Sequence, residues 1–403
     1  MILISIIGNI STQLLKLDGI NKTQIKVILV RPNAKCDKLG QEIAPYNEVI
    51  DLVTQDHNVL ADEIISAANR HKCDGIKIIS CVEDSMDMVG KLNEKLKTGG
   101  PGVQEIDAFR NKMKMKILAM KAGIRTPEYY DLGQEKNISA AYGIIRYAIQ
   151  KHGIVILKPK TGQSSKDVVA IKKIEQLSNI GLFNNHFRDF EVEQYIDGIL
   201  YHIDAITING EIKFSSAHRY NVPCLEFLNG KNLGSIPVLE EHKNERLIEF
   251  NKQVLSAFPG YDKVTHLEVF SSKNDLYFLE IAARPAGGPV RQMIYAMYNI
   301  DIFEEAIAIQ SSQENRSYSG LKKKLAGGYI FPKKNGLVEH INSPKLKSDF
   351  EFKTRVETGE RTQASQSLSD KFGELIFTST DIETIEEDFS NLGCFQVCKM
   401  IGV

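Results

Sequence analysis

The sequence has no excess of charge of either sign and no long hydrophobic run. Its 403 residues include 50 Lys and Arg and 51 Asp and Glu, which gives a formal net charge of −1. Nucleic acids and anionic membranes attract proteins with an excess of positive charge, so the composition supports neither partner. No apolar segment approaches the roughly 20 residues of a membrane-spanning helix. We therefore expect no binding to nucleic acid or to a membrane.

Cysteine is scarce. The six cysteines are scattered and form no Cys-x-x-Cys pair. Cys394 and Cys398 have the spacing of neighbours on a helix, so we expect packing residues, not metal ligands. Scattered thiols of this kind are typical of a reducing compartment. The apolar opening, residues 1–10, is short and has no basic residues ahead of it, so it predicts a buried strand and not a signal peptide. The expected location is the cytoplasm.

Two common nucleotide-binding motifs are missing as well. Gly8 follows the first apolar run but stands in GNISTQ, not in the Gly-x-Gly-x-x-Gly fingerprint of dinucleotide-binding domains. The small polar loop at residues 161–165 lacks the Gly-Lys-Ser/Thr ending of a Walker A motif, and strand residues follow it where a helix is needed. No internal repeat or long low-complexity stretch is present. A dinucleotide site of the usual kind and a P-loop are therefore not expected.

The first part of the chain alternates strand and helix patterns. Three continuous apolar runs, residues 2–8, 26–31 and 75–80, predict strands that are buried on both faces of a parallel sheet. Residues 58–71 place apolar side chains at helical spacing. The segment KTGGPGVQ, residues 97–104, is rich in turn formers and predicts a domain boundary. This part is expected to be a small α/β domain.

The most informative stretch begins at His266 and ends at Arg291. Two strand-forming runs, HLEVF and LYFLEIA, flank a polar turn at residues 271–275, which predicts a β-hairpin. We centre the hairpin on Asn274. The residues that then face each other are the pairs His266–Ala282, Glu268–Glu280 and Phe270–Phe278.

Glu268 and Glu280 form the pair of interest, because two carboxylates directly opposite each other on a sheet repel. Two solvated glutamates on an exposed face are the alternative, which the apolar neighbours Phe270, Phe278 and Ala282 on the same face make less favourable. A hard divalent cation takes carboxylate oxygens of this kind. We therefore predict that Glu268 and Glu280 hold Mg²⁺.

Arg284 and the pair Gly287-Gly288 follow directly and place a fixed cation beside a backbone that a ligand can approach closely. The pattern Glu268 … Leu-Glu280-Ile-Ala-Ala-Arg284-Pro-Ala-Gly-Gly resembles the metal-binding end of the ATP-grasp superfamily. Within that superfamily the chain resembles the carboxylate–amine ligases that join L-amino acids into dipeptides. The resemblance covers nearly the whole chain. It implies an α/β protein with the ATP-grasp fold, α+β in the ATP-binding part, after a Rossmann-like parallel-sheet domain.

The resemblance also implies a division into three parts. Residues 1–105 form the N-terminal α/β domain. Residues 106–312 form the ATP-grasp domain, with a small lid subdomain at about 125–198 and the metal-binding sheet at 199–312. Residues 313–403 form a closing subdomain that completes the substrate pocket. In that last part, the stretch KLAGGYIFPKKNGLVEHI predicts two paired strands around a Pro-Lys-Lys-Asn-Gly turn.

Two lysines are assigned to the nucleotide phosphates. A helix is predicted from Asp107, its N-cap, to Ala122, with Gly123 as its C-cap. Its first lysine, Lys112, falls where the resemblance places a phosphate-binding lysine, and the other lysines of this helix are expected to be solvated. Lys158 precedes the small polar loop, whose backbone N–H groups can bind phosphate; an ordinary surface hairpin is the alternative.

The resemblance assigns further residues to ATP. The stretch Glu193 to Ile196 runs along the adenine edge, and Tyr201 lies near the ribose. His218 contacts phosphate or substrate, with a buried structural histidine as the alternative. The residues expected to bind the nucleotide are Lys112, Lys158, Ser164, Ser165, Glu193, Tyr195, Ile196, Tyr201 and His218.

The expected reaction activates a carboxylate as an acyl phosphate and couples it to an amine. The cofactors are ATP and Mg²⁺, with Mn²⁺ as an alternative, and the expected partners are small molecules, namely amino acids. Arg284 stabilises the acyl phosphate and the tetrahedral adduct, and His266 is the candidate base because the register puts it on the metal face. The residues expected to bind the substrate are Arg284, Arg291, Gly287 and Gly288.

Several alternatives stay open. Ala282 stands where relatives often carry a metal-binding Asn, so one or two metal ions are both compatible with the sequence. A kinase or carboxylase that acts on a small metabolite could use the same scaffold. A nucleotide-binding module without turnover is a third reading, but such a module has no need for Arg284. A homodimer is the commonest closed assembly of soluble enzymes.

Overall fold

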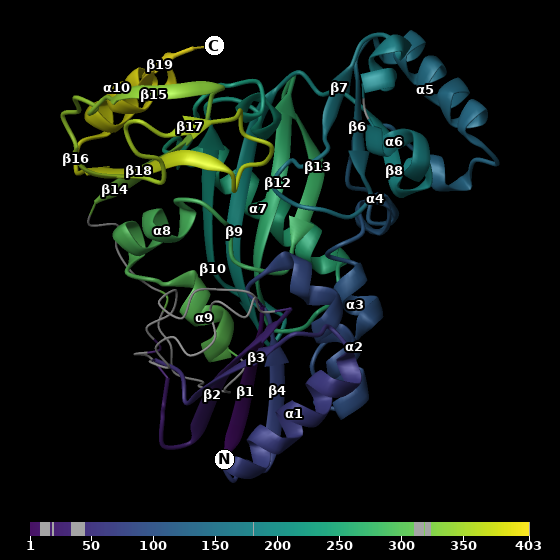
Figure 1. Ribbon diagram of the computed structural model, residues 1–403, viewed down its shortest axis with the longest axis vertical. Helices are drawn as coiled ribbons and strands as arrows, with labels where there is room; N and C mark the ends of the chain where they lie inside the picture. Colours follow the sequence, from purple (N-terminus) through teal and green to yellow (C-terminus); the bar gives the residue numbers. More distant parts are fainter. Residues whose placement is uncertain are drawn as a thin grey trace.

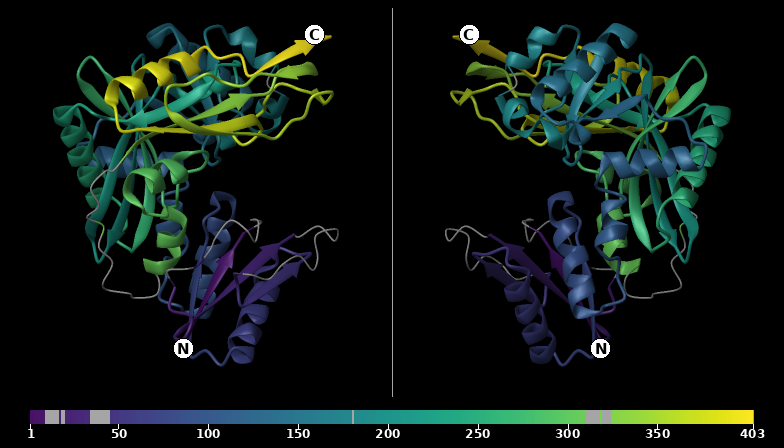
Figure 2. Two further views of the ribbon diagram at one scale, coloured as in Figure 1. Left: turned by 90° about the vertical axis from the view of Figure 1, so that its left-hand side faces the viewer. Right: turned by 90° about the vertical axis from the view of Figure 1, so that its right-hand side faces the viewer.

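The computed structural model describes residues 1–8, 17, 20–33, 45–179, 181–309, 318 and 324–402. Figure 1 shows the N-terminal elements at the bottom, a large sheet in the centre, a lid at the upper right and the C-terminal strands at the upper left. The N- and C-termini lie at opposite ends of the long axis, which both views of Figure 2 also show. No helix in these ranges is long and apolar enough to cross a bilayer.

The N-terminal part is a four-stranded parallel sheet with the strand order β3-β2-β1-β4. The strands are β1 (Ile2–Ile7), β2 (Ile25–Pro32), β3 (Glu48–Leu52) and β4 (Gly75–Ile79). Helices α1 (His57–Arg70) and α2 (Met86–Leu96) pack on one face, and α9 (Ile302–Ala308) packs on the other. The three predicted strands are therefore confirmed as buried on both faces, while the short strand β3 was not predicted. Gly8 directly follows β1, but the rest of GNISTQ and Cys36 lie outside the described residues.

The predicted helix 107–122 is shorter in the structure, where α4 begins at Lys112 and ends at Lys121, and a separate short helix, α3 (Val103–Asp107), precedes it. The side chain of Asn111 accepts hydrogen bonds from the N–H groups of Met113 and Lys114, so Asn111 is the N-cap of α4 and the prediction of Asp107 was wrong. Gly123 has a φ of +75°, as expected for a glycine just past a helix end.

The central sheet has eight antiparallel strands in the order β13-β12-β9-β10-β11-β14-β18-β16. The strands are β9 (Ile199–Ile208), β10 (Glu211–Tyr220), β11 (Leu233–Pro237), β12 (Lys263–Ser272), β13 (Asp275–Ala282), β14 (Leu325–Pro332), β16 (Asp349–Thr354) and β18 (Lys371–Ser379). Helices α4 and α7 (Glu241–Ala257) cover one face near β12 and β13. Helix α8 (Val290–Tyr298) packs near β9 and β12.

The lid is a separate antiparallel sheet with the order β5-β8-β6-β7, covered by α5 (Ile138–His152). Its other elements are β5 (Tyr129–Asp131), β6 (Val155–Pro159), β7 (Val169–Ile171), α6 (Gly181–His186) and β8 (Phe190–Gln194). Strands β6 and β7 form the predicted hairpin around the small polar loop. All of these elements fall within the range 125–198.

The C-terminal strands are divided between two sheets. Strands β14, β18 and β16 extend the sheet of β12 and β13, and the predicted division at 312/313 lies outside the described residues. The predicted pairing of β14 with β15 (Gly336–Ile341) is wrong. β14 is buried on both faces and lies between β11 and β18, whereas the half-exposed β15 pairs with β17 (Arg361–Thr362) and β19 (Cys398–Ile401). Helix α10 (Ile382–Gly393) covers β14 and β18.

Candidate active site

The β12–β13 hairpin brings the two predicted metal ligands together. Its turn is the pair Lys273-Asn274, with φ values of +48° and +67°, as in the primed turns that suit hairpins. His266 faces Ala282 and Glu268 faces Glu280, so the predicted register of these pairs is confirmed.

One residue of the hairpin was placed on the wrong face. A bulge at Leu279 shifts the register, so that Phe270 faces Tyr277 and not Phe278. Phe278 therefore packs into the core beneath α7, on the face opposite the glutamates. Leu279 instead packs near Phe270 and takes the position that was predicted for Phe278.

Lysines from two other elements approach Glu280. The Lys112 ammonium at the start of α4 lies 3.2 Å from the Glu280 carboxylate and donates a hydrogen bond to the Gly162 carbonyl in the β6–β7 loop. Burial alone would raise the pKa of Glu280, but the ammonium groups of Lys112 and Lys158 overcome this and hold it below its usual value. Lys112 thus connects the hairpin to the loop that was predicted to bind phosphate.

Lys116 is the functional candidate that sequence reasoning missed. It was expected to be solvated, but its side chain is fully buried, with the ammonium 2.5 Å from Glu191 and 2.7 Å from Glu193 on β8. Lys158 lies 2.7 Å from the same Glu193. Lys112 and Lys116 are four residues apart and share one helix face, which is the signal that could have found this cluster.

These charges determine the ionisation of Lys158 and Glu193. Burial would lower the pKa of Lys158, but the carboxylates of Glu193, Glu191 and Glu280 raise it well above its usual value. Burial would raise the pKa of Glu193, but Lys116 and Lys158 lower it to about 2. Lys158 is therefore a fixed cation whose position depends on Glu193. The Glu193 side chain thus forms ion pairs with Lys116 and Lys158, whereas the prediction for Glu193 concerned its backbone beside the adenine.

Two cavities meet at the hairpin. The first, the lid cavity, lies between the lid and the central sheet; its lining includes Ile156, Lys158, Ser165, Tyr195, Ile196, Phe270 and Leu279. The second, the central cavity, has a volume of about 390 Å³ and lies within the usual size of small-molecule sites. Its lining includes Ser164, Ser165, His266, Arg284, Gly287 and Gly288. Glu268 and Glu280 line both cavities and so mark their junction.

Two residues assigned to the nucleotide lie elsewhere. The side chain of Tyr201 packs in the core beneath α7, because successive residues of β9 alternate between the two faces of the sheet. His218 is fully buried and its ring stacks on that of His202, with centroids 4.8 Å apart. Neither residue is among the described residues that line the two cavities. We therefore withdraw the predicted ribose contact of Tyr201 and the predicted phosphate contact of His218.

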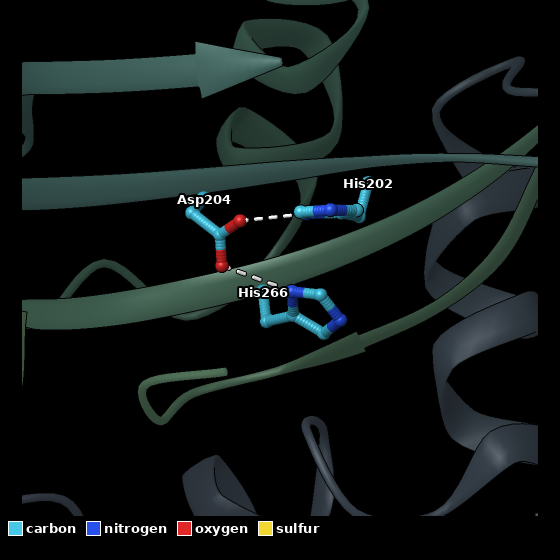
Figure 3. A group of neighbouring side chains, drawn as sticks. All are labelled: His202, Asp204 and His266. Atoms are coloured by element: carbon cyan, nitrogen blue, oxygen red, sulfur yellow. Dashed lines mark hydrogen bonds and ion pairs between the residues drawn. The ribbon is translucent and has the colours of Figure 1, made fainter. Parts of the chain in front are cut away.

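A hydrogen-bonded chain of side chains runs beneath the central cavity (Figure 3). The Ser235 hydroxyl lies 2.7 Å from His202 Nε2, and His202 Nδ1 lies 2.7 Å from Asp204. The second oxygen of Asp204 lies 2.9 Å from His266 Nδ1, and His266 Nε2 lies 3.7 Å from Glu268. Burial lowers the pKa of His202, so its neutral ring donates from Nδ1 and accepts from Ser235. The three residues of Figure 3 have the spacing of a metal site, but both Asp204 oxygens already accept hydrogen bonds.

These contacts with Asp204 and Glu268 contradict the predicted role of His266 as a base. Burial would lower the pKa of His266, but Asp204 and Glu268 raise it to about 10. The ring is therefore an imidazolium at neutral pH and has no free nitrogen lone pair to accept a proton. We assign it as a hydrogen-bond donor that faces Glu268.

The pKa values of His266 and His202 are expected to be shifted in opposite directions from the usual value of a histidine. In nuclear magnetic resonance spectra recorded over pH 5 to 10 with a chelator present, we expect His266 to stay protonated beyond pH 8 and His202 to titrate below its usual value of 6.5. Because the folded pKa of His266 is raised, its contribution to stability is complete below pH 6.5 and disappears as the pH rises through about 10. A His266 midpoint near 6.5 would contradict this assignment.

The predicted substrate residues separate into two groups. Arg284 lines the central cavity, where Glu83, in a short helical turn after β4, accepts hydrogen bonds of 2.8 Å and 2.5 Å from its guanidinium. Gly288, in the same cavity, has a φ of +63°, which favours glycine. Arg291 instead pairs with Asp301 at 2.5 Å, the residue that caps α9. The prediction that Arg291 holds a substrate carboxylate is therefore wrong, because a protein carboxylate takes that position.

Glu268 and Glu280 fit a hard divalent cation. Both are carboxylates at the junction of the cavities, and Glu268 also lies 3.4 Å from the Tyr220 hydroxyl and 3.5 Å from the Cys224 sulfur. Burial and the charge of Glu268 raise the pKa of Cys224, so it remains a neutral thiol donor and not a competing thiolate ligand. A set of oxygen donors of this kind suits Mg²⁺ better than a soft metal.

Comparison with known proteins points to one group of enzymes. No family model matches the chain. The chain is 25% identical over 318 residues to the L-arginine-specific L-amino acid ligase of Bacillus subtilis, a match that covers 74% of each protein. Its fold superposes on an L-amino acid ligase of Bacillus licheniformis with a TM-score of 0.75, at 17% identity, covering 100% of this chain and 98% of the other. The chain has the ATP-grasp fold and is similar in sequence to a carboxylate–amine ligase.

The same fold occurs in enzymes with other names. The N5-carboxyaminoimidazole synthetase of Staphylococcus aureus, solved in complex with ADP, superposes with a TM-score of 0.68 at 18% identity, covering 97% of this chain and 96% of the other. The likeness to these solved structures concerns the fold alone. The chemistry of this chain therefore depends on its own side chains.

Proposed function

We propose that the chain is an ATP-dependent ligase that joins two L-amino acids into a dipeptide and releases ADP and phosphate. One observation carries this proposal. Glu268 and Glu280 line both cavities, so a metal-bound phosphate chain that enters from the lid cavity would end beside the central cavity, where Arg284 lies. The similarity to an L-amino acid ligase supports amino acids as the substrates.

We assign the nucleotide to the lid cavity. Ile156, Ile196, Phe270 and Leu279 provide apolar surface for a flat base. Lys112 and Lys158 provide fixed positive charge at the end of the cavity that Glu280 lines. The loop that carries Ser164 and Ser165 would supply backbone N–H groups to the phosphates.

Glu268 and Glu280 would hold Mg²⁺. When bound, the ion neutralises charge on the β- and γ-phosphates of ATP. Before the ion binds, Lys112 keeps Glu280 ionised. His266 and the Cys224 thiol orient Glu268.

The chemistry takes place in two steps. A carboxylate oxygen of the first amino acid attacks the γ-phosphorus of ATP, which forms an acyl phosphate and releases ADP. The amine of the second amino acid then attacks the carbonyl carbon, and phosphate leaves with the oxygen that bridged the two groups. Arg284, held by Glu83, stabilises the negative charge that develops in both steps. The amine enters as its free base and loses its second proton to solvent or to the departing phosphate.

A direct test measures phosphate release from ATP and Mg²⁺ against pairs of proteinogenic L-amino acids, with product masses read in parallel. We expect release that requires two amino acids and a product whose mass equals their sum less one water. Release that needs one small molecule and gives a phosphorylated product would identify a kinase instead. Release that needs bicarbonate would identify a carboxylase, the other alternative that the sequence left open.

Lys158 provides a test of the nucleotide assignment. We expect Lys158→Met to weaken ATP binding by about 10- to 100-fold, because a charged hydrogen bond to phosphate is lost. Titration calorimetry with ATP in the presence of Mg²⁺ measures the change. Lys172→Met, an exposed lysine just after β7, is the matched control and should bind ATP like the unmodified protein. Equal ATP affinities in the two variants would contradict the assignment.

A further inference from the structure

The central cavity has acidic and basic walls. Its acids are Glu83, Glu268 and Glu280, and Arg284 is bound to the first of them. Besides Arg284 and the His266 imidazolium, the cations that line it come from the C-terminal region: Arg355 directly follows β16, and Lys371 begins β18. The sequence pointed to neither of these two residues.

Backbone pairing places Arg355 and Lys371 side by side. Strands β16 and β18 are antiparallel, with Thr354 opposite Gly373. The Arg355 N–H then donates a hydrogen bond of 2.8 Å to the Phe372 carbonyl, next to Lys371. The same wall is tied to the nucleotide side, because the Leu368 N–H donates a 3.0 Å hydrogen bond to the Ser164 carbonyl in the lid loop. The basic wall thus belongs to the same site as the loop over the lid cavity.

Among the described residues, one of these two cations has an acidic partner and the other has none. The Lys371 side chain is buried and forms an ion pair with Glu374. Burial lowers the pKa of Lys371, Glu374 opposes this effect, and Arg355 adds to the lowering. The Arg355 side chain is exposed, and no acid within the described ranges forms an ion pair with it. One positive charge on this wall is therefore left uncompensated, which favours an anion in the cavity.

We propose that Arg355 and Lys371 form a binding subsite for the carboxylate of the amino acid that supplies the amine. This inference rests on the proposed function. The carboxylate of the first amino acid is consumed when it is activated, whereas that of the second persists and becomes the carboxyl terminus of the product. Its amine must reach the junction marked by Glu268 and Glu280, where a second carboxylate would be repelled. The basic wall places that carboxylate away from the acids.

The test compares an acceptor amino acid with its α-carboxamide, which keeps the amine and loses the negative charge. In the unmodified protein we expect kcat/KM for the acid to exceed that for the amide by about 10- to 100-fold. Arg355→Gln should raise KM for the acid acceptor by about tenfold or more and leave kcat/KM for the amide and KM for the first amino acid unchanged. Arg355→Lys should restore part of the preference.

Lys353→Gln is the matched control, because Lys353 lies two residues earlier on β16, is exposed and pairs with Glu351. It should keep the full preference for the acid. Equal use of acid and amide by the unmodified protein, or an equal loss for both in Arg355→Gln, would overturn the subsite. Preference for an amine that carries a phosphate ester over every amino acid would overturn the carboxylate assignment. Absence of any amide product would overturn the proposed function and the subsite with it, and so differs from the other outcomes.

Discussion

Glu280→Gln is expected to lower the rate of ATP-dependent product formation by more than about 100-fold while the fold stays intact. The neutral amide removes one of the two carboxylates assigned to Mg²⁺, a larger loss than the 10- to 100-fold typical of residues that only support a metal ligand. The folded protein should lose less than about 1 kcal/mol, because the ion pair with Lys112 is partly exposed, with 35% of the Glu280 side chain accessible.

Asp275→Asn supplies the control for this variant. Asp275 lies at the start of the same strand, forms a surface ion pair with Arg125 and is not among the residues that line the two cavities. Steady-state kinetics and thermal unfolding of both variants separate a loss of chemistry from a loss of fold. A Glu280→Gln protein that works as fast as Asp275→Asn would contradict the assignment of the hairpin.

Lys116→Met is expected to have the largest effect on stability. Removal of one partner from a buried ion cluster leaves uncompensated charge, which typically costs about 3 to 5 kcal/mol. Glu191 and Glu193 are both buried, and Lys158 alone would then have to neutralise them. Denaturant titration measures the loss. Lys114→Met, on the same helix but in a surface ion pair with Asp107, should cost about 1 kcal/mol or less.

The same cluster predicts how stability depends on pH. The pKa of Glu193 falls from its usual value near 4.5 to about 2 in the folded protein. A depressed carboxyl pKa contributes stability that is complete above pH 4.5 and disappears as the pH falls towards 2. The unmodified protein should therefore lose unfolding free energy over this range, and Lys116→Met should lose less. If Lys116→Met and Lys114→Met are equally stable at pH 7, the buried cluster is not the source of this stability.

The elements that depend on local patterns were predictable from the sequence. Alternation and turn chemistry were enough to place Glu268 opposite Glu280, and continuous apolar runs were enough to locate β1, β2 and β4. The bulge at Leu279 was not predictable, because it depends on how Phe278 packs beneath α7. This shift of one residue turned Phe278 away from the glutamates and put Leu279 in its place.

The environments of charged residues were harder to predict, because their partners come from other elements of the fold. Lys116 meets Glu191 and Glu193 only after the lid folds onto α4, and Arg291 meets Asp301 only once α9 is in place. His266 had the predicted position but the opposite protonation state, since Asp204 on β9 lies beside it. The predicted ribose contact of Tyr201 was wrong because adjacent residues on a strand point to opposite faces of the sheet, and Tyr201 points into the core.

The most direct test follows one oxygen atom. The first amino acid is labelled with ¹⁸O in its carboxylate, and the phosphate released with the dipeptide is analysed by mass spectrometry. If that carboxylate attacks the γ-phosphorus of ATP and phosphate leaves when the amine attacks, each phosphate molecule carries one ¹⁸O. Phosphate that forms in step with the dipeptide but carries no ¹⁸O would show that the carboxylate is not activated as an acyl phosphate, and would contradict the proposed chemistry.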